Sequence, residues 1–287
     1  MADYIRSLCD AVGVPVERLF IVPGNHDVDI YAAGRTEAIK RVMFDRIGYY
    51  KSDDGTIEAC DIAAMMDGEK EFVSFLSKIY PSDRVALYGN PEAPHFCVET
   101  DDFNVLHLDS TLSYCPGQDR LDFIVGTKAL YNVVRGLNPS KPTVLLTHYP
   151  LLLLLQDERN RVSSMFQKNG VRLWLAGHEH EQVLQKIRYV DSLQAGELRL
   201  EDGAKASVLI GEYDDRSRHC CITVHAWYPL GWAQYPLVDL DNRSHPERYE
   251  CFLYPKEDSG ESLEVRLSKI ANREYYYRLP EKVEKSL

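Results

Sequence analysis

The sequence lacks the features of a disulfide framework and of a membrane protein. Its 7 cysteines are scattered without a C-x-x-C pair, and the adjacent Cys220 and Cys221 cannot easily bridge each other. This is ordinary cysteine usage for a reducing compartment. The longest apolar run, YPLLLLLQ, is far too short to span a bilayer, and the N-terminal MADYIRSLCDAVG has charges among its apolar positions, unlike a secretory signal. We therefore expect a soluble, cytoplasmic protein that makes no use of a membrane.

An excess of positive charge is also missing. The chain has 44 acidic and 33 basic residues and a net charge of -11, so a broad electrostatic surface for a nucleic-acid backbone is not expected. Nucleic acid is expected at most as a substrate, and a site that handles phosphate would need local cations. With 287 residues, 45% of them hydrophobic, and without internal repeats or low-complexity segments, the chain is expected to fold as a single domain, residues 1–287.

The hydrophobic pattern alternates between helical and strand-like segments, which is typical of an α/β protein. Gly13 is expected to end the first helix. Further along, short strands separated by turns are expected to form an antiparallel second sheet. We expect helices at 2–12, 36–47, 68–80, 125–137 and 157–167, and strands at 19–22, 84–89, 95–100, 103–110, 143–148, 171–177, 207–213, 219–229 and 249–255.

Histidines follow several of the expected strands directly. They lie in the stretches FIVPGNHDVD, LLTHYP and LAGHEHE. In open α/β sheets, ligands gather at the carboxyl ends of strands, and histidine nitrogen and asparagine oxygen are ligands of first-row transition metals. Gly24 and Gly177 would allow sharp turns that aim the next side chain at a shared centre. A single histidine at a strand end is more often structural, but three such clusters in one chain favour a metal site.

These motifs resemble a known family. GNHD at 24–27, the TH that ends at His148 and GHEH at 177–180 resemble, in order, the third, fourth and fifth sequence blocks of the calcineurin-like metallophosphoesterase superfamily. The resemblance implies an α/β fold in which a two-sheet sandwich is flanked by helices, in the layer order α/β/β/α. Residues 1–181 would carry the motifs, and residues from about 182 to 287 would be mostly strands of the second sheet.

The resemblance also implies a catalytic site. It implies that Asn25, His148 and His178 bind one divalent metal ion and that His180 binds a second. It further implies that His26 donates a proton to the leaving oxygen and that Asp27 orients His26. The expected reaction is hydrolysis of phosphomonoesters or phosphodiesters by metal-activated water, with a phosphate ester as the substrate. Mixed nitrogen and oxygen ligands do not distinguish manganese, iron and zinc.

The chain departs from the family pattern near its beginning. The Asp-x-His and Gly-Asp blocks that normally precede the GNH block are not found, and only 23 residues come before Gly24. We therefore expect an N-terminally incomplete fold in which the second metal lacks ligands. The alternative is a non-catalytic metallophosphoesterase-like module whose partial metal site has a structural or protein-interaction role. The presence of His26 favours the enzyme, because a structural site has no use for a leaving-group acid.

Overall fold

The computed structural model describes residues 1–43, 55–115, 123–178, 183–187, 190–196, 206–228, 231–235 and 248–254. Its helices are α1 (Ala2–Val12), α2 (Arg35–Met43), α3 (Ala59–Met66), α4 (Lys70–Leu76), α5 (Ser82–Tyr88), α6 (Thr127–Arg135) and α7 (Gln156–Lys168), with short 3-10 turns η1 (Val16–Arg18), η2 (Asn25–Asp27), η3 (Asp67–Glu69) and η4 (Leu151–Leu153). Its strands are β1 (Phe96–Glu99), β2 (Asn104–His107), β3 (Thr143–Leu146), β4 (Val171–Ala176), β5 (Val183–Ile187), β6 (Val190–Gln194), β7 (Ser207–Asp214), β8 (His219–Tyr228), β9 (Gly231–Tyr235) and β10 (Tyr249–Phe252).

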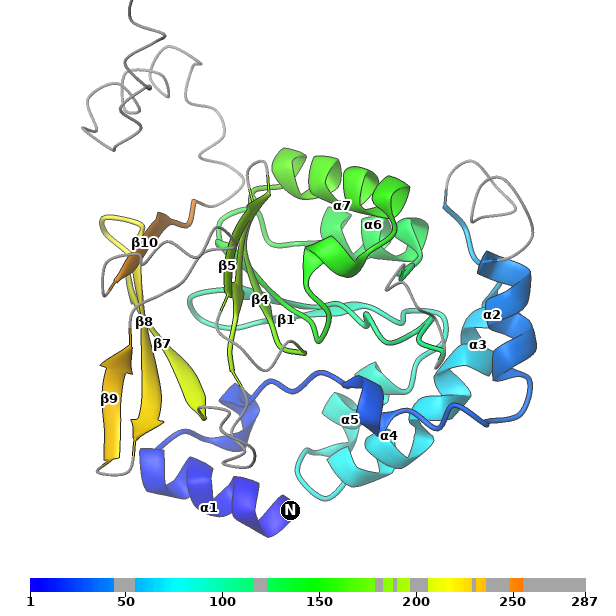
Figure 1. The fold of residues 1–287 in the computed structure, drawn as a ribbon, viewed down its shortest axis with the longest axis horizontal. Coiled ribbons are helices and arrows are strands. Elements are labelled where there is room, and N and C mark those ends of the chain that lie inside the picture. The colour runs from blue at the N-terminus through cyan, green and yellow to red at the C-terminus, as the bar shows by residue number, and fades with distance from the viewer. Residues whose placement is uncertain are drawn as a thin grey trace, which may run out of the picture.

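A mixed sheet forms the centre of the molecule (Figure 1). Its strand order is β1-β2-β3-β4-β6-β5. Strands β2, β3, β4 and β6 are parallel, and the antiparallel strands β1 and β5 lie at the two edges. Because parallel neighbours end at the same side, the segments that follow β2, β3 and β4 meet at one edge of the sheet.

Helices α6 and α7 cover one face of this sheet. Leu130 of α6 and Phe166 of α7 are fully buried with Leu106, Leu145 and Trp174 of the sheet. The Phe166 and Trp174 rings pack edge to face, with centroids 5.7 Å apart. This shared core fixes the parallel strands in place and hence the loops at their carboxyl ends.

A second, antiparallel sheet packs on the other face of the first (Figure 1). Its order is β10-β8-β7, and β9 also pairs with β8. Every second residue of β8 is buried, so Ile222 and Val224 point toward the core and contact Leu173 and Leu193 of the first sheet. The predicted two-sheet α/β fold is confirmed. Strands β5 and β6 belong to the first sheet, so the segment after residue 182 contributes to both sheets.

Several local predictions agree with the structure, and two do not. Helix α1 has the predicted bounds, and Gly13 ends it in the left-handed conformation with φ of 68°. The strand predicted at 84–89 is wrong, because these residues form α5. Their apolar side chains meet the core at helical spacing, with Val85 and Tyr88 packed in one cluster. Helix α3 was not predicted, although its buried Ile62 and Met65 have the same spacing.

The predicted strand at 19–22 is also wrong. This segment is extended but lies outside the strands of the described sheets. Its carbonyl groups are satisfied by side chains, since the Tyr80 hydroxyl donates to Leu19 O at 3.0 Å and the Tyr88 hydroxyl donates to Ile21 O at 2.8 Å. The two tyrosines therefore lead the chain into the Gly24 turn without a neighbouring strand.

None of the helices in the described residues is long and apolar enough to cross a lipid bilayer.

Candidate metal centre

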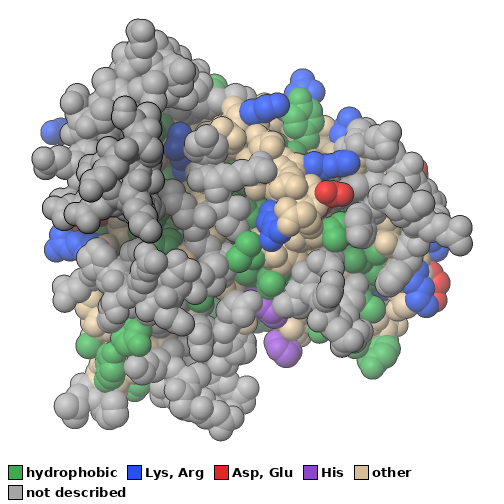
Figure 2. Space-filling view, turned by 45° about the horizontal axis from the view of Figure 1, so that its top comes forward, with side chains coloured by type: hydrophobic (Ala, Val, Ile, Leu, Met, Phe, Trp, Pro, Cys, Tyr) green, Lys and Arg blue, Asp and Glu red, His purple; other side chains and the backbone are tan. Residues whose placement is uncertain are grey.

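The GNHD segment forms a tight 3-10 turn, η2, directly after the extended segment. The Gly24 N–H donates to Asp27 Oδ2 at 2.9 Å, and the Asp27 N–H donates to Gly24 O at 3.0 Å. Asp27 therefore closes the turn on itself. Asn25 is half-buried, whereas His26 is exposed at the top of the turn. Histidine side chains are among those that reach the molecular surface in the view of Figure 2.

Gly24 lies against the imidazole of His148. A Cβ atom at position 24 would lie 3.1 Å from both Cε1 and Nδ1 of His148. That is tighter than nine in ten real Cβ contacts, so an added Cβ would require the imidazole to shift by a few tenths of an ångström.

His148 and His178 follow neighbouring parallel strands, β3 and β4. The strands stay paired beyond their regular ends, because Thr147 N–H donates to Leu175 O at 3.1 Å and Gly177 N–H donates to His148 O at 3.0 Å. This pairing brings the two imidazoles together with ring centroids 5.1 Å apart. The sequence prediction that these histidines meet at the carboxyl edge of the sheet agrees with this arrangement.

His178 adopts a left-handed backbone conformation, with φ of 79°. For a residue with a Cβ atom this costs about 1–3 kcal/mol, and such residues cluster at functional sites. The conformation ends β4 and turns the His178 ring toward His148.

Tyr149 supports both histidines from below. Its ring is fully buried, with its centroid 4.8 Å from that of His148 and 4.5 Å from that of His178. It stacks on Phe123 at 4.0 Å, and its backbone N–H donates to Ser110 Oγ at 2.9 Å. Burial raises the pKa of Tyr149 above its ordinary value. Tyr149 therefore remains neutral and packs against both imidazoles from the side of the core.

Asn25 completes the group of converging side chains. Its Oδ1 atom lies 2.9 Å from Nε2 of His148. Ligands bound to one ion at about 2.0–2.2 Å and at right angles lie about 2.8–3.1 Å apart, so this distance is compatible with two ligands on one metal. An amide oxygen and two imidazoles also suit manganese, iron or zinc. By their chemistry and their common position at the sheet edge, the three residues suit one divalent ion.

Two of the predicted roles remain predictions. The described contact of the Asp27 carboxylate is with Gly24 N–H, and the predicted orientation of His26 by Asp27 stays a prediction. His180, the predicted ligand of a second ion, lies outside the described residues. Across the described ranges, no three His, Cys, Asp or Glu side chains gather closely enough to hold a metal, so the amide of Asn25 is needed to complete a set of three ligands.

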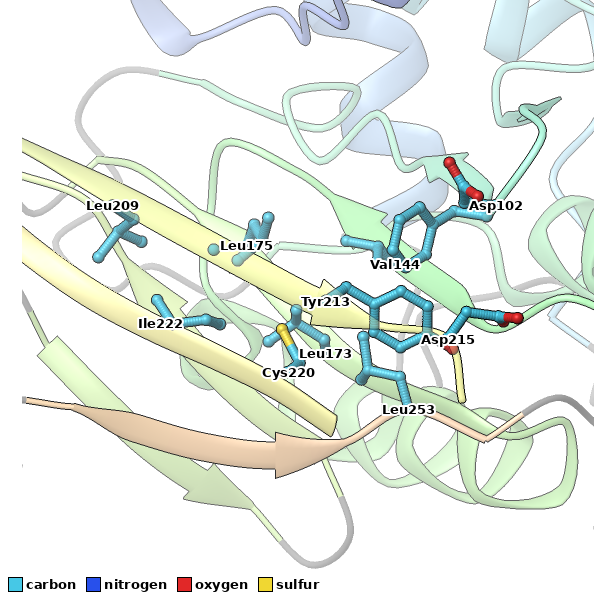
Figure 3. A pocket seen from close by; sticks show the side chains of 12 residues that line it. Asp102, Val144, Leu173, Leu175, Leu209, Tyr213, Asp215, Cys220, Ile222 and Leu253 are labelled. Atoms are coloured by element: carbon cyan, nitrogen blue, oxygen red, sulfur yellow. The ribbon is translucent and has the colours of Figure 1, made fainter. Parts of the chain in front are cut away.

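A pocket of about 440 Å³ lies elsewhere, between the two sheets. Figure 3 shows apolar side chains from both sheets, such as Leu173 and Ile222, pointing toward one another, with the carboxylates of Asp102 and Asp215 at one end. None of the predicted metal ligands lines it. Its lining is that of a sandwich core, so the candidate site for chemistry is the edge formed by Asn25, His148 and His178.

Sequence reasoning did not find the supporting residues Ser110 and Tyr149. A signal was present, because Ser110 follows β2 and Tyr149 follows the parallel neighbour β3, so both belong to the same sheet edge.

Comparison with known proteins yields one family and distant relatives. A model of the family described as calcineurin-like phosphoesterase matches residues 1–182. The uncharacterized metallophosphoesterase-like protein YydB of Bacillus subtilis (strain 168) is 21% identical over 187 residues, which are 62% of this chain and 37% of YydB. The chain thus spans little more than a third of the length of that curated relative.

Solved structures give only faint likenesses. A double mutant of Vps29 from Entamoeba histolytica is 14% identical, with a TM-score of 0.23 over 43% of this chain and 76% of that one. GAP50, the anchor in the inner membrane complex of Plasmodium, is 14% identical, with a TM-score of 0.30 over 56% of this chain and 52% of that one.

Proposed function

Because the chain belongs to the calcineurin-like phosphoesterase family, we propose that it serves in the metal-dependent hydrolysis of phosphomonoesters or phosphodiesters. The observation that carries this proposal is the 2.9 Å approach of Asn25 Oδ1 to His148 Nε2, beside the ring of His178. These residues come from three separate segments, and the structure brings their potential ligand atoms to the same edge of the sheet.

Each residue has a stated task in this proposal. Asn25, His148 and His178 would hold a divalent ion. Such an ion, when bound, polarises a phosphoryl oxygen, makes a bound water more acidic and stabilises the charge of the transition state. His26 would donate its proton to the departing oxygen, since it is exposed on the same turn as Asn25 and histidine titrates near neutral pH. The metal supplies the local positive charge that an acidic chain otherwise lacks.

Metal-dependent turnover of simple esters tests the proposal. The purified protein is depleted of metal, reloaded with Mn²⁺ or Zn²⁺, and assayed with p-nitrophenyl phosphate and bis-p-nitrophenyl phosphate. Hydrolysis should return with metal and be lost in His148→Ala. Hydrolysis that survives metal removal, or that is unchanged in His148→Ala, would refute it.

A second candidate function is a non-catalytic module with a structural or protein-interaction role. It is favoured by one observation, namely that the converging side chains in the described residues suffice for one ion only. Tight binding of one ion, without turnover of either ester under any metal, is the outcome that would select this candidate.

A further inference from the structure

Three charged residues are buried together beside the metal centre. Arg35 at the start of α2, Glu69 in η3 and Asp109 after β2 are 0%, 3% and 6% exposed. Charged side chains are rarely this buried unless they are paired and hydrogen-bonded. No role in the proposed chemistry accounts for them.

Arg35 joins several segments through its guanidinium. It donates to Thr111 O at 3.1 Å and to Tyr114 O at 3.0 Å, and it also donates to Met65 O. Burial lowers the pKa of Arg35, while the nearby carboxylates of Glu69 and Asp109 raise it again. Since arginine stays protonated in proteins, the cluster contains one fixed positive charge.

The two carboxyl groups face each other around Thr111. Asp109 Oδ1 accepts from the Thr111 N–H and lies 2.9 Å from the Thr111 hydroxyl, which lies 3.1 Å from Glu69 Oε1. Asp109 Oδ2 is buried, and neither an N–H nor a hydroxyl group in the described structure reaches it. The Thr111 hydroxyl has one hydrogen and can donate it to only one of the two carboxyl groups, so the other of these two contacts needs a donor from the carboxyl side.

These contacts make sense only if one carboxyl carries a proton. Two ionised carboxylates would repel each other and would leave the buried cluster with a net negative charge. One shared proton supplies the donor that the second contact with the Thr111 hydroxyl lacks, and it brings the summed charge of Arg35, Glu69 and Asp109 to zero. Burial, the charge of Asp109 and the hydrogen bond with it all raise the pKa of Glu69 well above its ordinary range.

The cluster is tied to both halves of the metal centre. On one side, Asp29 N–H, just after the GNHD turn, donates at 2.7 Å to the carbonyl of Gly68, the neighbour of Glu69. On the other side, Ser110, the neighbour of Asp109, accepts from the N–H of Tyr149, which follows His148.

We propose that Glu69 and Asp109 share one proton in the folded protein, and that the neutral cluster they form with Arg35 positions the loop of Asn25 against the loop of His148. The shared proton does not depend on the proposed function. The positioning of a metal centre, in contrast, rests on the proposed function. Glu69, Asp109 and Arg35 are positioning residues and do not touch the reacting atoms.

Other titratable groups in the described residues also face the cluster. The carboxylate of Asp29 acts on Arg35 through its charge, and the thiol of Cys115 lies near the guanidinium. His95 accepts the Asp109 N–H at its Nδ1 and donates from Nε2 to Val125 O, so it is the neutral Nε2–H tautomer. Burial lowers the pKa of His95, which keeps it neutral. The proton therefore belongs to the carboxyl pair and not to the imidazole.

Infrared difference spectroscopy tests the shared proton directly. At neutral pH, the spectrum of the wild type minus that of Glu69→Gln should show the carbonyl band of a protonated carboxyl group. This band should disappear when the wild type is brought to strongly alkaline pH. Asp61→Asn is the matched control, because Asp61 is equally buried but is an ion-pair partner that accepts from Arg41 Nε at 2.8 Å. The spectrum of wild type minus Asp61→Asn should lack the band. Absence of the band from the first difference spectrum would overturn the shared proton, whatever the second spectrum shows.

Thermal melting and Zn²⁺ titration test the cluster as a positioning device. The amide introduced by Glu69→Gln can donate to Asp109 as the protonated acid does, so this variant should melt within a few degrees of wild type and keep its Zn²⁺ affinity. The double variant Glu69→Gln, Asp109→Asn removes both buried carboxyl groups that face Arg35 and should melt well below either single variant. Glu69→Ala should weaken Zn²⁺ binding about tenfold or more, as the loss of supporting contacts around metal ligands does.

Two results would overturn the positioning role. One is a double variant as stable as the single variants, and the other is equal Zn²⁺ affinity in Glu69→Ala and Glu69→Gln. Wild-type protein that binds no Zn²⁺ would overturn that role and the proposed function together, while the infrared result would still decide the shared proton.

Discussion

The side-chain oxygen of Asn25 lies 2.9 Å from Nε2 of His148, although the two residues are 123 positions apart in the chain. The contact joins a turn at the start of the molecule to the end of a central strand. Its geometry depends on Gly24, which lies against the same imidazole, and on Tyr149, which packs beneath it. The candidate metal centre therefore depends on long-range packing as much as on its ligands.

The first prediction concerns the number of metal ions. The 287-residue chain should hold one divalent ion through Asn25, His148 and His178 more tightly than a second ion at His180, because three converging ligands bind better than one. Metal analysis after extensive dialysis should give one ion per chain, and less than one for Asn25→Ala. Two tightly held ions would mean that further ligands complete the site.

The second prediction concerns the close approach of Gly24 to His148. In Gly24→Ala the new methyl group would meet the imidazole at 3.1 Å and push it from its position, so metal affinity should fall about tenfold or more. Gly136→Ala is the matched control, since the nearest atom to its new Cβ would be a carbonyl oxygen at an ordinary 3.5 Å. Calorimetric titration with Mn²⁺ measures both, and equal affinities in the two variants would contradict the prediction.

The third prediction separates general-acid catalysis from binding. His26→Ala should slow the hydrolysis of alkyl phosphates by about 10²–10⁴-fold, because an alkoxide departs poorly without a proton. The aryl oxide of an ester such as p-nitrophenyl phosphate leaves without a proton, so the hydrolysis of aryl esters should be affected far less. Steady-state kinetics on both ester types decide the matter, and equal losses would assign His26 to binding or structure.

The fourth prediction concerns acid stability and His107. This residue is buried and stacked on Phe96, with ring centroids 4.4 Å apart, and burial lowers its pKa to about 3. An unfolded histidine titrates near about 6.5, so between these values the unfolded chain binds more protons than the folded one. The free energy of unfolding should therefore decrease as pH falls below about 6.5, by up to about 1.4 kcal/mol per pH unit from this residue.

Substitution of His107 checks this sign. His107→Phe keeps a ring against Phe96 and cannot titrate, so its stability should fall less steeply with acid than that of the wild type. Urea unfolding at several pH values between about 3 and 7 measures the two slopes. Parallel curves would show that His107 does not contribute to the acid sensitivity.

Local sequence patterns were sufficient to predict elements, such as the first helix, whose ends are set by a single residue. The helix at 2–12 ends at Gly13 because only glycine enters the left-handed region without cost, and that requirement is visible in the sequence. The segment at 84–89 shows where such reasoning fails. A short apolar run satisfies both strand and helix patterns, and the contact of Tyr88 with Ile21, 67 positions away, favours the helix.

The sequence by itself determined which side chains would stand at the carboxyl ends of β3 and β4 and in the GNHD turn, because strand ends and glycine turns leave local signatures and the motif order identifies the family. Only the tertiary structure decided that Asn25 Oδ1 contacts Nε2 of His148 directly, that Tyr149 packs beneath the two histidines, and that Glu69 and Asp109 face each other beside Arg35. These relationships depend on which segments are buried against one another. Burial is what changes the charge state of a carboxyl group, and no local pattern in the sequence encodes it.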